Sequence, residues 1–353
     1  MEELVSTTRK SIKKSTLMFM ISMMAITIVF MVAVLIVTVS YFLSKEKEPT
    51  GVVLASGEAI YTEEELNAII FEREDAAKEE ILTFVRDSID EGRSIVGILR
   101  ELYPEQTVVY AGSKYHIFDY NENLVANPYA NDNFNVDENG VVEYNDGTIS
   151  SKKGIDVSKF QGDIEWDEVK QDGVEYAFIR MGYRGYGSEG KLVTDETFEK
   201  NIKEATESDI DVGVYFFSQA INEEEAIEEA KYVLEAIAGY DVNYPVVIDI
   251  EEVTDKGART ADMTKEDWTK VCIAFCETIK EAGYTPMVYG NLKTFFIMLD
   301  MEQISMYDKW FAQYDTSVYF PYEFKIWQYS DSGSIKGIST DVDLNVSFYE
   351  PTK

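Results

Sequence analysis

The longest uninterrupted apolar stretch of the chain runs from Leu17 to Leu43 and contains 27 residues without a charge. As a helix it would extend about 40 Å, more than the roughly 30 Å hydrocarbon core of a bilayer. It is preceded by Arg9, Lys10, Lys13 and Lys14. We therefore predict a cytoplasmic tail at 1–16 and a transmembrane helix at 17–43, with the remainder outside the cell. A cleaved signal peptide is the alternative.

Between Thr62 and Leu102, apolar residues recur at nearly helical spacing. Thr62 and Glu65 fit a capping box at its beginning, and Pro104 lies just after its end. We predict a linker and helical stalk over 44–103. The spacing is not a strict heptad, so a coiled-coil dimer is left open.

Short strand-like runs follow between residues 104 and 150, separated by turns rich in asparagine and glycine. They predict a small β-rich spacer whose function the sequence does not indicate. The runs are Val108–Tyr110, Tyr115–Tyr120 and Val141–Tyr144.

From Gly154 onward, apolar runs typical of buried parallel strands alternate with helical segments. Helices follow the first five of eight runs, whereas the last gaps are too short for full helices. This pattern predicts an α/β fold over 151–353, an irregular (β/α) barrel of eight strands with about five helices. The predicted strands are Ile155–Phe160, Tyr176–Gly182, Val212–Ser218, Pro245–Glu251, Pro286–Gly290, Lys309–Tyr314, Phe324–Tyr329 and Asp341–Val346. The predicted helices are Glu165–Gln171, Glu196–Ser208, Glu223–Ala238, Lys265–Ala282 and Leu292–Leu299.

Charge and residue usage exclude several function classes. The formal net charge of −33 argues against a nucleic-acid partner, because phosphate binding needs clustered lysine and arginine. The single histidine, His116, lies outside the barrel, so neither a Ser-His-Asp site nor a His-ligated zinc site can form within it. Cys272 and Cys276 are predicted to be buried core thiols. No metal or cofactor is predicted.

Two carboxylates end the fourth predicted strand. Asp249 and Glu251 are two residues apart and therefore share one face of that strand. The active site of a (β/α) barrel lies where the strands end. Crowded carboxylates raise one another's pKa, which yields a general acid near neutral pH. Taken alone, this pair is equally consistent with a solvated strand end beside Glu252.

Further acidic residues lie within the first and last predicted strands, Asp156 and Asp343. Because these strands are neighbours in a closed barrel, both side chains are expected to converge with Asp249 and Glu251 on one cleft. Such a cluster favours a carboxylate-only glycosidase. A divalent-metal site uses similar residues and is the alternative.

These motifs together resemble glycoside hydrolase family 25, the Chalaropsis-type lysozymes, over nearly the whole of the predicted barrel. The matching segments occur in the family's order, whereas residues 1–150 lie outside the resemblance. The segments are Gly154–Ser158, Phe178–Gly182, Gly213–Ser218, Asp249–Glu251, Ala282–Tyr284, Val288–Asn291, Ile326–Tyr329 and Val342–Asn345.

The resemblance implies catalytic roles for the acidic cluster. Glu251 would be the general acid, with Asp249, Asp156 and Asp343 as supporting acids. The substrate's own acetamido group would attack the anomeric carbon while Asp249 orients it. Direct inversion, with Asp156 or Asp343 as the base, is left open, as is the stereochemical outcome.

Residues near other strand ends are candidates for substrate binding. Tyr215, Tyr289 and Trp327 are expected to stack on sugars or to bind the acetamido group. Arg180 is expected to pair with a carboxylate of the site or with an acid group of the substrate. Trp310 is instead expected to pack the barrel.

The sequence as a whole predicts a single-pass membrane protein with an extracellular muramidase domain. The resemblance implies that it cleaves peptidoglycan between N-acetylmuramic acid and N-acetylglucosamine, in cell-wall remodelling. A membrane or wall-spanning protein complex is a further partner that this architecture allows. The alternatives are a catalytically idle glycan-binding module that positions such an assembly, and an enzyme acting on another N-acetylated glycan.

Overall fold

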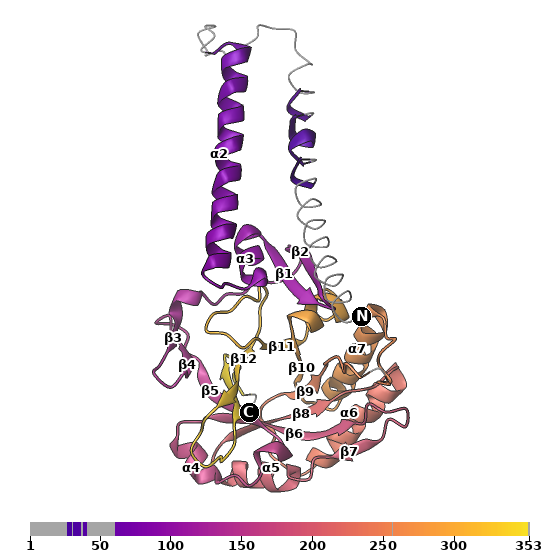
Figure 1. Ribbon diagram of the computed structural model, residues 1–353. Coiled ribbons are helices and arrows are strands. Elements are labelled where there is room, and N and C mark those ends of the chain that lie inside the picture. Colours follow the sequence, from indigo (N-terminus) through magenta and orange to yellow (C-terminus); the bar gives the residue numbers. More distant parts are fainter. Residues whose placement is uncertain (1–26, 30, 37, 41–60, 256, 352–353) are drawn as a thin grey trace, which may run out of the picture. The chain divides into compact units, whose positions relative to one another are not determined.

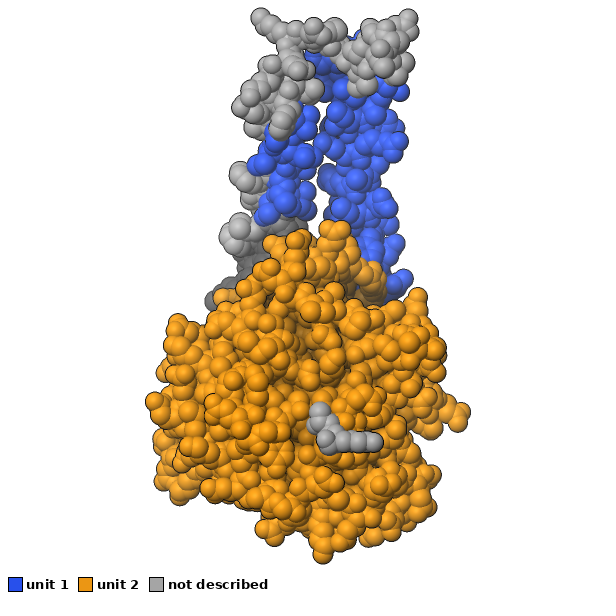
Figure 2. Space-filling view, turned by 180° about the vertical axis from the view of Figure 1, so that it is seen from behind, with its two compact units in different colours: residues 1–91 blue, residues 92–353 orange. Residues whose placement is uncertain are grey.

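The computed structural model describes residues 27–29, 31–36, 38–40, 61–255 and 257–351. The chain forms two compact units, residues 1–91 and 92–353, which Figure 2 distinguishes by colour. The predicted cytoplasmic tail, the linker at 44–60 and the rest of the predicted span at 17–43 lie outside the described residues. Among the described residues, no helix is both long enough and apolar enough to cross a membrane.

The first unit contains the long helix α2, Glu63–Asp90 (Figure 1). Its first turn is closed by a capping box, in which the Thr62 side chain accepts from the Glu65 backbone and the Glu65 carboxylate accepts from Thr62. Apolar side chains along the helix are exposed, with Phe71 at 71%.

The predicted helical stalk is formed by two helices rather than one. Gly92 adopts a φ of +77°, a left-handed conformation that ends a helix. A separate helix, α3 (Ile95–Leu102), then begins after Ser94, whose side chain caps it by accepting from the Gly97 backbone. Helix α3 belongs to the second unit.

The predicted β-rich segment forms two hairpins in the second unit. One pairs β1 (Gln106–Ala111) with β2 (Lys114–Asp119), and the other pairs β3 (Phe134–Val136) with β4 (Val142–Tyr144). Both pack on the barrel. Phe134 on β3 packs against Trp327 with ring centroids 5.3 Å apart, and the Tyr319 hydroxyl accepts from the Val108 backbone on β1 at 2.9 Å. The hairpins therefore share their core with the barrel.

The rest of the unit is a closed eight-stranded barrel, which confirms the predicted number and order of strands (Figure 1). The ring closes because β5 pairs with both β6 and β13. A short strand that the sequence did not predict, β7 (Leu192–Thr194), pairs with the end of β6. The barrel strands are β5 (Lys152–Val157), β6 (Tyr176–Arg184), β8 (Asp211–Phe217), β9 (Val246–Asp249), β10 (Pro286–Asn291), β11 (Asp308–Ala312), β12 (Ile326–Gly333) and β13 (Val342–Ser347).

The last strand departs from the expected parallel barrel. β13 is antiparallel to both of its neighbours, β12 and β5. The cause is the short connection after Gly333, which cannot hold the crossover that two parallel strands require. The start of β13 consequently lies at the same end of the barrel as the carboxyl ends of the other strands.

In the described part of the barrel, four α-helices lie outside the strands, and two 3-10 turns complete the unit (Figure 1). The predicted fifth helix is instead a π-helical turn, η3 (Thr294–Met298). The α-helices are α4 (Trp166–Gln171), α5 (Phe198–Glu207), α6 (Glu223–Ile237) and α7 (Lys265–Glu281), and the 3-10 turns are η1 (Asn131–Asn133) and η2 (Lys159–Gln161).

Side chains alternate between two core layers along each strand, as strand geometry requires. On β6, Tyr176 and Phe178 fill the barrel interior, whereas Ala177 and Ile179 pack outward beneath the helices. Cys272 and Cys276 are buried free thiols on α7, as predicted. Because of this alternation, the inward-facing side chains are the ones that line the end of the barrel where the acidic residues lie.

Candidate active site

Interior-facing positions at one end of the barrel place all four predicted acidic residues around a single cleft of about 290 Å³. Asp156 and Asp249 lie on β5 and β9, and Glu251 follows β9 by two residues. Asp343 lies directly opposite Asp156 in the β13–β5 pairing. Because β13 is reversed, Asp343 reaches this cleft from the start of its strand rather than from its end.

Asp156 is strongly enclosed, with 5% of its surface exposed. Its Oδ2 atom accepts hydrogen bonds from Gln328 Nε2 and Asn345 Nδ2, each at 2.8 Å. Burial raises the pKa of Asp156 despite these donors. Burial, and then the charge of Asp156, raises the pKa of Asp343 to about 9. At neutral pH this pair of carboxyls therefore retains a proton.

Asp249 and Glu251 form a second coupled pair. Burial raises the pKa of both carboxyls, and the nearby charge of Glu251 raises that of Asp249 further. A hydrogen bond from Asp249 partly offsets the rise in the pKa of Glu251. The pair therefore holds a proton at a pH where isolated carboxyls are ionised, which is what a general acid near neutral pH requires.

The backbone that carries this pair is held on both sides. Ser218 N donates to Asp249 O at 3.0 Å, and Thr294 Oγ1 donates to Ile250 O at 3.0 Å. Behind Ser218, the buried Glu229 accepts from Ser218 Oγ at 2.6 Å and from Arg184 at 2.7 Å. Burial raises the pKa of Glu229 to about 7. The contacts of Ser218 and Thr294 hold the backbone at Asp249 and Ile250 in place.

Three of the four predicted substrate-binding residues line the cleft: Tyr215, Tyr289 and Arg180. The Tyr289 hydroxyl donates to Gln328 Oε1 at 2.8 Å. Arg180 pairs with the buried Asp195 at 2.6 Å, a partner outside the acidic cluster. This ion pair holds the guanidinium at the cleft wall, where its charge partly offsets the rise that burial causes in the pKa of Asp249.

The placement expected for Trp327 was wrong. Its side chain is fully buried in the outer layer, where Nε1 donates to Gln313 O at 2.8 Å and the ring packs against Phe134. Trp310 packs the barrel interior, as expected, and also lines the cleft. The error concerns which face of the strand Trp327 occupies, because it lies between the inward-facing Ile326 and Gln328 on β12.

Two polar residues of the site, Gln328 and Asn345, were missed by the sequence analysis. Gln328 lies within the run Ile326–Tyr329, which is otherwise apolar, and Asn345 lies two residues after Asp343, on the same face. The positions of both residues could have been recognised from the sequence alone. Among the described residues, no cluster of three or more His, Cys, Asp or Glu side chains is arranged to hold a metal ion.

The family model for glycosyl hydrolases family 25 matches residues 155–338, just over half of the chain. The chain belongs to this family. The match includes Asp156, Asp249 and Glu251 of the acidic cleft but ends before β13 and Asp343, and it confirms the prediction of a glycoside hydrolase. The family 25 domain thus begins within β5 and excludes both hairpins.

Relatives of this family 25 protein include enzymes named as lysozymes. It is 26% identical over 202 residues to the autolytic lysozyme of Clostridium acetobutylicum, covering 55% of each chain. It is 28% identical over 207 residues to lysozyme M1 of Streptomyces globisporus, covering 56% of this chain and 67% of that protein.

A solved structure is also similar, that of the modular autolysin LytC from Streptococcus pneumoniae in complex with a synthetic peptidoglycan ligand. The TM-score is 0.51 at 26% identity, and the match covers 69% of this chain and 56% of that one. The chain thus spans little more than half the length of the autolysin.

Proposed function

We propose that this family 25 protein hydrolyses the bond between N-acetylmuramic acid and N-acetylglucosamine in peptidoglycan. The observation that carries the proposal is the convergence of four carboxyls with raised pKa values on one cleft that is also lined by Tyr215 and Trp310. The names of the relatives, two lysozymes and an autolysin solved with a peptidoglycan ligand, support the same substrate.

In the proposed mechanism, Glu251 protonates the glycosidic oxygen as the bond from that oxygen to the anomeric carbon breaks. The oxygen of the substrate's acetamido group bonds to the anomeric carbon, and Asp249 orients that group. Water then attacks the same carbon, the Glu251 carboxylate takes the water's proton, and the acetamido group is released. Asp156 and Asp343, which share a proton, set the charge around Glu251.

Direct inversion is the alternative chemistry, with Asp156 or Asp343 activating a water for a single displacement. Proton NMR of the anomers formed in the first minutes of reaction separates the two routes. Acetamido participation keeps the anomeric configuration of the substrate, whereas single displacement inverts it.

The first prediction is that the full-length protein releases reducing ends from purified peptidoglycan. Mass spectrometry of the products is expected to show fragments that end in reducing N-acetylmuramic acid. A binding module without activity would produce no fragments. Fragments that end in reducing N-acetylglucosamine, or cleavage only of a different N-acetylated glycan, would contradict the proposed bond or substrate.

We also propose that the protein is anchored in the cell membrane by residues 17–43, with the barrel outside. The uncharged run of 27 residues and the basic residues before it support this orientation. An anchored enzyme can reach only glycan close to its own membrane, which favours remodelling of that cell's wall over lysis of other cells. It would also be placed to work within a membrane or wall-spanning complex.

The second prediction tests this anchor by fractionation of cells that produce the full chain. The protein is expected in the membrane pellet, resistant to high salt and released by detergent, and digestible by protease added outside the cell. Deletion of residues 1–44 should move it to the soluble fraction. Recovery of a shortened, soluble form from the full chain would show a cleaved signal peptide instead.

A further inference from the structure

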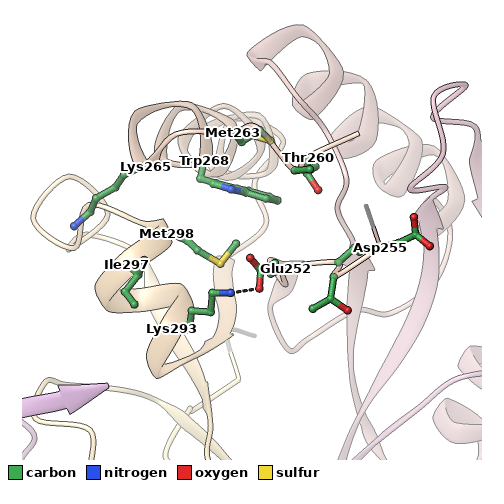
Figure 3. Close-up of a pocket in the computed structure, with 12 residues that line it drawn as sticks. Glu252, Asp255, Thr260, Met263, Lys265, Trp268, Lys293, Ile297 and Met298 are labelled. Carbon is green, nitrogen blue, oxygen red and sulfur yellow. Dashed lines mark hydrogen bonds and ion pairs between the residues drawn. The ribbon is translucent and has the colours of Figure 1, made fainter. Parts of the chain in front are cut away.

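A second cavity, of about 530 Å³, opens beside the family 25 cleft and is lined by three segments of the chain (Figure 3). The connection after β9 supplies one wall, the beginning of α7 a second and η3 a third. None of the described lining residues is shared with the catalytic cleft. The lining residues are Glu252, Val253, Thr254, Asp255, Thr260, Ala261, Met263, Lys265, Trp268, Lys293, Ile297 and Met298.

The lining combines both signs of charge with apolar side chains. Glu252 forms an ion pair with Lys293 across the cavity, and the two point toward each other in Figure 3. Burial lowers the pKa of Lys293, so its ammonium is held in a partly dry environment. Ile297, Met298 and Trp268 are apolar residues of the lining, and Met298 and Trp268 are only 7% and 5% exposed.

This chemistry suits a peptide better than a glycan. A neutral sugar offers hydroxyls and flat faces that stack on open aromatic rings, yet the Trp268 ring is almost completely covered. A short peptide offers carboxylate and amine groups for Lys293 and Glu252, and aliphatic side chains for Met298 and Ile297. The volume is within the range of roughly 300–1,000 Å³ typical of small-ligand sites.

The position of the cavity connects it to the reaction. Glu251 lines the catalytic cleft and its chain neighbour Glu252 lines the second cavity. Consecutive Cα atoms lie about 3.8 Å apart, so the cavity begins one residue from the proposed acid. In peptidoglycan the peptide is attached to the muramic acid ring, the sugar whose glycosidic bond is broken. A peptide on that ring therefore leaves the cleft close to Glu251.

A hydrogen-bond relay also joins the cavity wall to the proposed acid. Thr260 Oγ1 donates to Gln219 Oε1 at 3.0 Å, and Gln219 Nε2 donates to Ser218 O at 2.8 Å and to Glu251 O at 3.5 Å. Gln219 is fully buried. The segment that forms one wall of the cavity is thus tied to the backbone that carries Glu251.

We propose that this cavity binds the peptide substituent of the substrate and makes the enzyme prefer peptide-bearing glycan. The proposal rests on the proposed function, because the peptide reaches the cavity only when its sugar occupies the cleft. Lys293 binds a peptide carboxylate, Glu252 binds an amine, and the apolar wall holds the aliphatic side chains.

The third prediction compares two synthetic substrates with the same wall-type tetrasaccharide, one carrying the peptides and one without them. The full-length protein is expected to cleave the peptide-bearing substrate with a kcat/KM at least tenfold higher. Lys293→Ala should remove most of that preference and leave kcat/KM for the bare tetrasaccharide unchanged, because it removes a cation that only the peptide contacts. Ile297→Trp, which fills the cavity, should do the same.

The matched control is Lys270→Ala on α7, which removes a lysine paired with Glu266 at 2.6 Å, away from the cavity. It should retain the preference, and thermal unfolding should confirm that all variants fold. Equal cleavage of both substrates by the unaltered protein would overturn the peptide site alone. Loss of activity on both substrates in Lys293→Ala would also overturn it, because that points to a structural role. Cleavage of neither substrate by the unaltered protein would instead remove the proposed function, and the peptide site with it.

Discussion

Glu251→Gln is expected to lower the rate at which reducing ends are released from peptidoglycan by about 10²–10⁴-fold. Glutamine has nearly the shape of glutamate but cannot transfer a proton to the glycosidic oxygen. The surroundings of Glu251 favour that transfer, because burial and then the charge of Asp156 raise its pKa. The loss is expected in kcat, since the substitution leaves the aromatic walls of the cleft intact.

Two control measurements accompany this fourth prediction. Glu224→Gln alters an exposed carboxylate in the first turn of α6 and should keep full activity. Thermal unfolding should show that Glu251→Gln folds normally. A rate close to that of the unaltered protein would remove Glu251 from the mechanism, whatever the similarity to other family members.

The strands of the barrel could be predicted from the sequence because each is buried on both faces and therefore reads as a continuous apolar run. The direction of the last strand could not be read from that pattern. A run of apolar residues is the same in either direction, and only the short connection after Gly333 indicates that β13 returns antiparallel. The break at Gly92 was visible as a glycine, but only its φ of +77° shows that the helix ends there.

The acidic cluster was predictable for a related reason. A carboxylate inside an apolar strand is costly unless it has a function or a partner, so Asp156, Asp249 and Asp343 were conspicuous. No comparable feature of the sequence indicated which way the tryptophans of the barrel strands face. Trp310 and Trp327 are both large, apolar and buried, and only the register of their strands separates the cleft wall from the outer layer. Gln328 was the better guide on β12, because a polar residue within an apolar strand usually faces a partner.

Asp156→Asn is the fifth prediction, and its effect is a displaced pH profile. The charge of Asp156 raises the pKa of Glu251, so its removal should lower that pKa. A general acid works only while protonated, so the alkaline limb of the activity profile should move to lower pH. Asparagine still offers an oxygen to Gln328 and Asn345, which keeps the local geometry. If Asp156 is instead the base of a direct inversion, activity should collapse at every pH without a shift.

The same substitution should make the protein more stable at neutral pH. Burial raises the pKa of Asp156 in the folded state above its ordinary value of 3.8. Below pH 3.8 the carboxyl is protonated in both the folded and the unfolded protein, so its titration does not change the free energy of unfolding. As the pH rises, the unfolded chain ionises first, so the free energy of unfolding falls until the pH passes the raised pKa of the folded protein. The asparagine side chain does not titrate, so the Asp156→Asn variant should have the higher free energy of unfolding and the higher Tm at pH 7, and this difference should vanish near pH 4. An advantage that is independent of pH would mean that packing, rather than the buried charge, separates the two proteins.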